Sequence, residues 1–187
     1  MPDTVRKKEI GSPPVAGTVI VISGSLRAGS FTSTLCRAIV NQYPNFVMRD
    51  YVRALPTYDG DLDTATPPQS VADLRRELGE SHAVLIGTPE YNYNVPGGLK
   101  NVIDWASRPF AKHCLIGRRI GVFGCSPGDR GGKASVEYLR NMIPLFGATL
   151  IGPELLIPKV NTVIGDDGSI EASVMQRLSS LAGELAA

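Results

Sequence analysis

The sequence has few residues of several kinds, and each shortage excludes a class of protein. Its 187 residues include three cysteines, Cys36, Cys114 and Cys125, which are too few and too scattered for a disulfide framework. No run of about eighteen apolar residues occurs, so no membrane partner is expected. The 19 basic residues are balanced by 18 acidic ones, and residues 6–8 form the only short basic cluster. Nucleic acid is therefore not an expected partner.

Side chains typical of hydrolases and metalloenzymes are also scarce. The chain has two histidines, His82 and His113, and no Cys/His pair has the spacing of metal ligands, so no metal site is expected. Residues 124–128, "GCSPG", match the nucleophile elbow G-x-S-x-G, but both histidines precede Ser126. A hydrolase triad in its usual chain order is thus excluded. We interpret Cys125, at the end of an apolar run, as inert packing.

The remaining composition is that of one globular domain. Hydrophobic residues make up 43% of the chain, which is enough for a single core at this length. Residues 1–16 mix charges with prolines and lack the apolar core of a signal peptide, so we expect a flexible N-terminal arm and a cytoplasmic protein. The domain is expected to span residues 17–187.

Strand and helix patterns alternate along this domain. Apolar runs predict strands at 17–22, 46–52, 82–88, 119–125 and 149–156, and helical spacing predicts helices at 33–43, 70–79, 98–107, 132–146 and 170–185. Fully apolar strands indicate a parallel sheet with helices on both faces. The prediction is an α/β, flavodoxin-like three-layer sandwich of order 2-1-3-4-5, with ligands outside the carboxyl ends of the strands.

The loop after the first predicted strand, residues 24–32, reads "GSLRAGSFT". It lacks the glycine spacing of a dinucleotide fingerprint, and Ser30 stands where a P-loop has its lysine. The hydroxyls of Ser25, Ser30 and Thr32, the Arg27 guanidinium and the N–H groups of a helix start fit a single terminal phosphate. The alternative is that Ser30 only caps the helix.

Two further loops follow the third and fourth predicted strands. Residues 88–101, "TPEYNYNVPGGLKN", combine aromatic, amide and proline residues, which suit a rigid wall for a flat heterocycle. The alternative is a helix entry with Tyr91 and Tyr93 packed in the core. Lys100 and Asp104 are expected to form a helix-surface ion pair. We interpret the glycines at 128, 131 and 132 as bare backbone against a planar ligand.

With these loops described, the chain resembles the NADPH-dependent FMN reductase family, flavodoxin-like flavoproteins that include quinone, chromate and azo-dye reductases. The resemblance covers residues 18–157 and is carried by "GSLRAGSFT" and by "PEYNYNVPGGLKNVIDW" at 89–105, with a looser match of "SPGDRGG" at 126–132. It implies FMN as cofactor and NADPH as co-substrate. The first loop would then hold the 5′-phosphate of FMN.

The resemblance also implies a set of FMN-binding residues. Residues 25–32 would surround the phosphate, residues 89–92 would flank the isoalloxazine, and residues 126 and 128 would approach its other side. The family usually has asparagine at the position of Thr32, so one phosphate contact is expected to be shorter or water-mediated. It often has arginine at the position of Ala134, which puts a subunit contact made by that arginine in doubt. The expected site residues are Ser25, Arg27, Ser30, Phe31, Thr32, Pro89, Glu90, Tyr91, Asn92, Ser126 and Gly128, with no catalytic side chain.

The implied reaction is a hydride transfer from NADPH to the flavin, followed by reduction of a flavin, quinone, azo or metal-oxyanion acceptor at the same face by a ping-pong mechanism. An electron carrier like flavodoxin is the alternative, but such carriers are strongly acidic and this chain has a net charge of +1. A regulatory flavin-binding function is a further alternative. Arg27 could contact either the FMN phosphate or NADPH. We expect a homodimer or homotetramer, with Val102, Trp105 and Phe110 in the interface.

Overall fold

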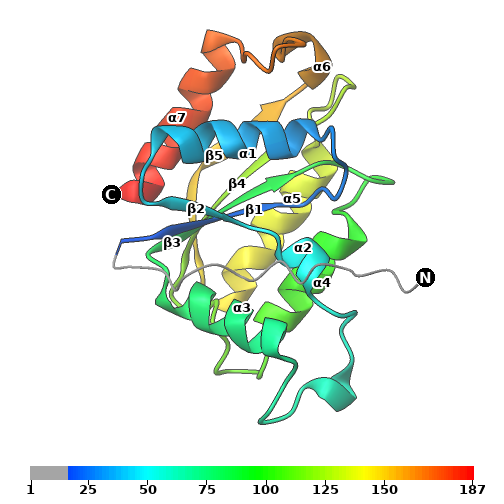
Figure 1. Ribbon diagram of the computed structural model, residues 1–187, viewed down its shortest axis with the longest axis vertical. Coiled ribbons are helices and arrows are strands. Elements are labelled where there is room, and N and C mark those ends of the chain that lie inside the picture. The colour runs from blue at the N-terminus through cyan, green and yellow to red at the C-terminus, as the bar shows by residue number, and fades with distance from the viewer. Residues whose placement is uncertain (1–16) are drawn as a thin grey trace, which may run out of the picture.

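A five-stranded parallel sheet of order β2-β1-β3-β4-β5 forms the centre of the molecule (Figure 1). The computed structural model describes residues 17–187, and the predicted N-terminal arm lies outside the described residues. The predicted strand order is confirmed. The strands are β1 (Val19–Ser23), β2 (Phe46–Arg49), β3 (Ala83–Thr88), β4 (Arg119–Cys125) and β5 (Thr149–Ile157).

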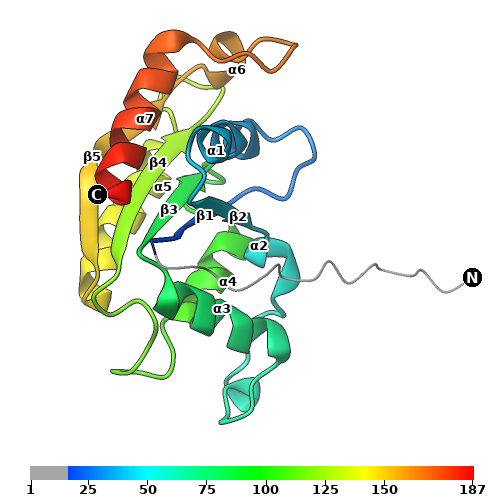
Figure 2. The ribbon, with the colours of Figure 1, turned by 60° about the vertical axis from the view of Figure 1, so that its left-hand side comes forward.

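Helices cover both faces of this sheet, as Figures 1 and 2 show from two directions. The helices α1 and α7 pack on one face, and α2, α3, α4 and α5 pack on the other. The helical elements are α1 (Phe31–Gln42), α2 (Tyr51–Ala54), η1 (Gly60–Leu62), α3 (Gln69–Glu80), α4 (Gly97–Ala106), α5 (Lys133–Met142), η2 (Ile143–Phe146), α6 (Val160–Val163) and α7 (Ala172–Ala186).

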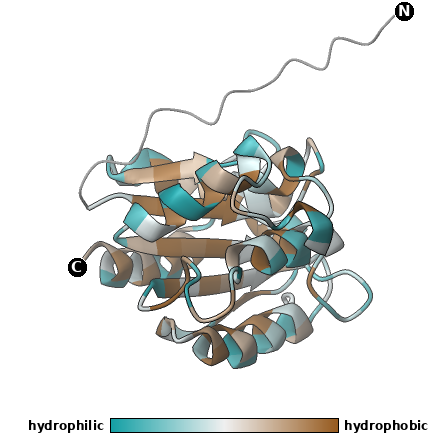
Figure 3. Cartoon of the chain, turned by 90° about the horizontal axis from the view of Figure 1, so that it is seen from below, coloured by the Kyte–Doolittle hydropathy of each residue, from teal (hydrophilic) through white to brown (hydrophobic). Residues whose placement is uncertain are grey.

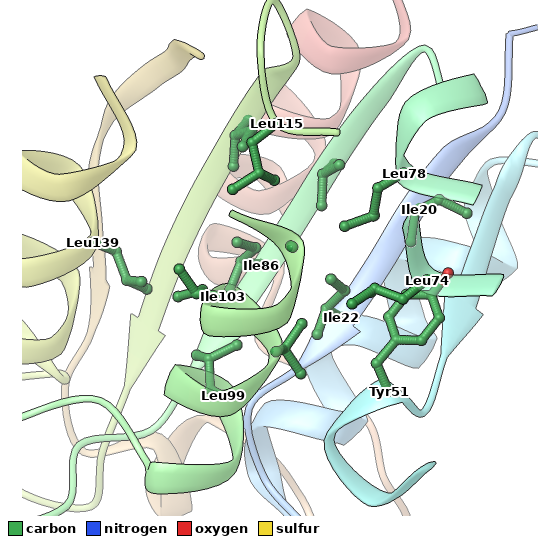
Figure 4. Packing of buried hydrophobic residues seen from close by; sticks show 14 of the residues in the cluster. Ile20, Ile22, Tyr51, Leu74, Leu78, Ile86, Leu99, Ile103, Leu115 and Leu139 are labelled. Carbon is green, nitrogen blue, oxygen red and sulfur yellow. The ribbon is translucent and has the colours of Figure 1, made fainter. Parts of the chain in front are cut away.

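The alternation of side chains along each central strand produces two separate cores. In β1, Val19 and Val21 face α1 and α7, whereas Ile20 and Ile22 face α3 and α4. All four are buried, which explains the uninterrupted apolar run in the sequence. Figure 3 shows the same pattern, with hydrophobic strands at the centre, and Figure 4 shows the core on the α3 and α4 side.

Two predicted boundaries are wrong. The strand predicted to reach Val52 ends at Arg49, and the short helix α2 begins at Tyr51. The helix predicted over 132–146 changes to the 3-10 helix η2 at Ile143, because Pro144 has no N–H to continue the α-helical pattern. The short helices η1 and α6 were not predicted from the sequence.

The sheet order brings three loops to one edge of the molecule. The carboxyl ends of β1, β3 and β4 lie side by side, and the N–H of Gly24 donates to the carbonyl of Gly87 across 2.8 Å. Residues far apart in the sequence thus become neighbours beyond this edge. In the described part of the chain, none of the helices has the length and apolarity needed to cross a membrane.

Candidate functional site

Beyond the carboxyl ends of β1, β3 and β4 lies a hollow of about 240 Å³, which we call the hydroxyl-lined hollow. The structure brings together all of the predicted site residues here except Asn92 and Gly128. The lining consists of Ser25, Arg27, Ser30, Phe31, Thr32, Pro89, Glu90, Tyr91, Cys125, Ser126, Pro127 and Val160.

The first loop enters α1 through a capped helix start. Ser30 is the N-cap, and its Oγ accepts a hydrogen bond from the N–H of Ser33 across 3.2 Å. The capping interpretation of Ser30 is therefore confirmed, and the same residue also lines the hollow. A hydroxyl that accepts from its own helix keeps its proton free to donate. Because the first N–H groups of an α-helix have no intrahelical acceptor, this end of α1 adds donors to the hollow.

Arg27 carries the positive charge of this lining. Its guanidinium donates to the carbonyl of Gly29 across 2.9 Å and stands 5.8 Å from the ring centroid of Phe31. Both contacts hold it on the side of the first loop that faces α1. The arginine is exposed, so a ligand can reach it without any rearrangement of the core.

The loop after β3 contains a tight turn at residues 91–94. Tyr91 and Asn94 exchange two backbone hydrogen bonds of 3.0 Å, while Asn92 and Tyr93 take positive φ values of 51° and 60°. A left-handed conformation is uncommon for residues other than glycine, asparagine and aspartate. Tyr91 is 48% exposed and Tyr93 is 74% exposed, so the alternative that places them in the core is wrong.

Glu90 is the acidic residue of the lining, and its carboxylate is already engaged. Its Oε2 accepts a hydrogen bond from the N–H of Ala134 across 2.7 Å. Ala134 lies in the first turn of α5, where a negative charge is favoured. Glu90 thereby ties the loop after β3 to α5.

The second half of the motif at 89–105 has a structural role. Asn101 bonds the carbonyl of Pro56 and the N–H of Tyr58, at 2.8 and 2.7 Å, and the indole N–H of Trp105 donates to the same Pro56 carbonyl at 2.9 Å.

Val102 and Trp105 are buried, so the expected apolar surface around them is wrong. Of that predicted group only Phe110, 84% exposed, reaches solvent. The predicted pair of Lys100 and Asp104 is confirmed at 2.6 Å.

Two of the three glycines singled out after β4, Gly131 and Gly132, are required by the packing of the chain itself, and the ligand contact of Gly128 stays a prediction. A Cβ on Gly131 would lie 2.8 Å from the backbone nitrogen of Pro158, and one on Gly132 would lie 3.1 Å from that of Cys125. Both have positive φ values. The chain's own backbone therefore demands these glycines, and neither lines the hollow. Nearby, the Arg130 guanidinium stands 5.3 Å from the ring centroid of Tyr93, which joins the second and third loops.

Cys125 forms part of the buried floor of the hydroxyl-lined hollow. Its Sγ lies 3.1 Å from the Oγ1 of Thr32, and burial raises the pKa of its thiol to about 11. The thiol is therefore neutral at pH 7, in accord with inert packing. Sequence reasoning missed Cys125, Pro127 and Val160 as lining residues. Cys125 and Pro127 flank the predicted site residue Ser126, so their position in the sequence could have indicated them. Val160 lies in α6, and no pattern in the sequence indicated it.

A second hollow, of about 410 Å³, adjoins the first. We call it the apolar hollow, because aliphatic side chains and bare glycines make up most of its wall. It shares Arg27 and Tyr91 with the hydroxyl-lined hollow. The lining consists of Gly24, Leu26, Arg27, Val52, Tyr91, Pro96, Gly97 and Gly98.

Comparison with known proteins gives a consistent result. The family model described as NADPH-dependent FMN reductase matches residues 18–162. A quinone reductase of Pseudomonas putida is 33% identical over 156 residues, 82% of this chain and 84% of that protein. A quinone reductase of Escherichia coli is 32% identical over 180 residues, 90% of this chain and 92% of that protein.

Among solved structures, the flavoenzyme FerB of Paracoccus denitrificans, an NAD(P)H:(acceptor) oxidoreductase, superposes with a TM-score of 0.79. The two sequences are 31% identical, and the match covers 90% of this chain and 96% of that one.

Proposed function

Because this chain belongs to the NADPH-dependent FMN reductase family, and is thus an oxidoreductase that uses FMN and a reduced nicotinamide, we propose that it reduces small quinone-type acceptors at the expense of NADPH. The observation that carries the proposal is the hydroxyl-lined hollow, where loops after three neighbouring strands converge at the point that this sheet order leaves for a ligand.

The donor set of the hollow fits the phosphate end of FMN. Ser25, Ser30 and Thr32 supply hydroxyls, the start of α1 supplies backbone N–H groups, and Arg27 supplies a positive charge. The carboxylate of Glu90 accepts a hydrogen bond from the first turn of α5, and the thiol of Cys125 is neutral. A phosphate dianion would thus meet donors on the side of the first loop.

Two other loops would hold the flavin ring. Residues 89–91 form one wall of the hollow, and Ser126 and Pro127 form another. We place Asn92 and Gly128 at the outer ends of these walls, beyond the hollow itself. When bound, FMN supplies the hydride-accepting and electron-donating chemistry. The protein binds and orients the ring, and no side chain of the lining is required as an acid or base.

The apolar walls beside the flavin favour acceptors with flat rings. Quinone reductases are among the relatives of this chain. We extend the acceptor range to free flavin and azo compounds, because a stacking platform discriminates poorly among planar molecules. Metal oxyanions have no flat ring to stack, so we propose them as weaker substrates. NADPH and acceptor would use the same face in turn, which gives ping-pong kinetics.

The test begins with the purified protein. Extraction and mass analysis should recover one FMN per chain, and NADPH oxidation should depend on an added quinone. Initial rates at several quinone concentrations should give parallel double-reciprocal lines. A protein that ignores added FMN contradicts the proposal, and intersecting lines contradict the shared face.

An electron carrier is the second candidate function, because the fold is shared with flavodoxins. The net charge of +1 does not favour it, since carriers of this kind dock through strongly acidic surfaces. A carrier would accept electrons from a reductase protein and would not oxidise NADPH by itself. The same assay separates the two functions.

We further propose that the protein is a cytoplasmic homodimer or homotetramer. Phe110 is 84% exposed and Leu145 is 83% exposed, so these two side chains are the apolar groups that we propose for the interface. Light scattering measures the assembly directly. A particle of 20.0 kDa, the mass of one chain, would contradict it.

A further inference from the structure

The apolar hollow lies next to the proposed flavin site, and most of its lining residues take no part in that site. It opens between the first loop, α2 and the entry to α4, and it meets the hydroxyl-lined hollow at Arg27 and Tyr91. Its side walls are the aliphatic groups of Leu26, Val52 and Pro96. No carboxylate stands among these lining residues, so the hollow offers apolar surface beside a single positive charge.

Val52 is the side chain that closes this hollow from the α2 side. A Cβ placed on Gly98 would lie 2.6 Å from the Cγ1 of Val52. The two helices α2 and α4 therefore approach each other as closely as a glycine allows. Because Val52 is also a lining residue, the size of the side chain at position 52 affects the space in the hollow.

The helix that carries Val52 is held from both sides. It has four residues, too few for a helix to be stable alone. The phenol of Tyr51 donates to Oε2 of buried Glu77 at 2.5 Å, and Arg53 donates to the carbonyl of Leu26 in the first loop at 2.9 Å. Figure 4 shows Tyr51 beside Leu74 of α3 in the core. These contacts fix the position of Val52.

We propose that the apolar hollow seats the ring of the electron acceptor and that Val52 sets the size of ring that is accepted. This inference rests on the proposed function. The acceptor class is a quinone, and the balanced reaction is quinone plus NADPH plus one proton to hydroquinone plus NADP⁺. Apolar walls favour a carbocyclic ring over a hydrated metal oxyanion.

The decisive experiment compares one-ring and two-ring acceptors in FMN-loaded protein. The ratio of kcat/KM for 1,4-naphthoquinone to that for 1,4-benzoquinone is measured in wild type, Val52→Ala and Val52→Phe. The ratio should rise about tenfold in V52A and fall about tenfold in V52F, as expected for a change of a methylene or more in an apolar pocket. Ratios that change less than twofold in both variants overturn the inference.

Val71→Ala is the matched control. Val71 belongs to the same buried core as Val52 and loses the same two methyl groups, but it does not line the hollow. It should lower stability without moving the ratio. If V71A shifts the ratio as V52A does, the effect is one of general loosening and the assignment of Val52 is wrong.

A binding measurement provides a readout that does not depend on turnover. Fluorescence titration with 2-naphthol, a two-ring molecule that the enzyme does not reduce, should show about tenfold tighter binding to V52A than to V52F. Equal affinities overturn the inference. FMN content should be the same in all variants, since Val52 does not line the hydroxyl-lined hollow. Wild-type protein that lacks FMN or NADPH oxidation would instead refute the proposed function.

Discussion

The two hollows share Arg27 and Tyr91 in their linings and differ in chemistry. The hydroxyl-lined hollow has Ser25, Ser30 and Thr32 in its wall and belongs to three strand ends. The apolar hollow is lined mainly by glycines and aliphatic side chains, and it lies between the first loop, α2 and the entry to α4. The hydrogen-bond donors of the hydroxyl-lined hollow suit a cofactor that remains bound. The apolar surface of the second hollow suits acceptors that bind and leave in each turnover.

This difference shows how retention and turnover can be separated within one site. Charge-assisted hydrogen bonds are directional and strong, so they hold one group in one place. Contact with apolar walls is weaker and less directional, so it tolerates several ring systems. Substitutions on the hydroxyl side should therefore change cofactor binding, and substitutions on the apolar side should change acceptor choice.

The largest effect is expected for Ser25→Glu. A carboxylate beside the phosphate should weaken FMN binding about 100-fold or more, because like charges at contact distance repel by several kcal/mol near a protein surface. Equilibrium dialysis of FMN measures it. Ser25→Gln has nearly the same size without the charge and serves as the control. Equal losses in both variants would show that volume rather than charge matters there.

A smaller effect is expected for Gly98→Ala on the apolar side. The added methyl collides with Val52, so the free energy of unfolding should fall by about 1 to 3 kcal/mol while FMN affinity stays unchanged. Urea unfolding measures the loss. Gly97→Ala is the neighbouring control, since a Cβ there meets nothing within 4 Å. Loss of FMN from G98A would mean that the two hollows are not independent.

Arg27→Ala tests the boundary between the hollows. The guanidinium stands near the Phe31 ring and donates to the carbonyl of Gly29, on the proposed phosphate side, so FMN affinity should fall about tenfold. In FMN-saturated enzyme the preference for NADPH over NADH should be unchanged. Steady-state kinetics with both nucleotides decide the matter. A lost preference with unchanged FMN affinity would assign Arg27 to the nucleotide.

The smallest effect is expected for the floor of the hydroxyl-lined hollow. The pKa of Cys125 is raised to about 11 by burial, so its thiol is neutral at lower pH and turns negative only as the pH rises to that value. FMN affinity between pH 7 and 9 should therefore have the same profile in wild type and in Cys125→Ser. If FMN affinity falls toward pH 9 in wild type but not in Cys125→Ser, a thiolate at position 125 repels the phosphate and the prediction is wrong.

The sheet order and three site loops were predictable, because the strands are buried on both faces and the loops follow their ends. The apolar hollow was not, since Val52 was assigned to a strand and its place in α2 depends on the distant contact of Tyr51 with Glu77. Trp105 shows the same limit. It was expected at the surface, yet its indole N–H reaches Pro56, a contact without a local pattern.

The strand order also has a consequence for folding. β1 pairs directly with β3, although α1, β2, α2, η1 and α3 lie between them in the sequence. The hydroxyl-lined hollow is therefore complete only after contacts between distant parts of the chain have formed. Unfolded chains then have no affinity for FMN, and cofactor at about 100 times its Kd should add about 2.7 kcal/mol to the free energy of unfolding. A host starved of riboflavin should therefore accumulate less of the folded protein.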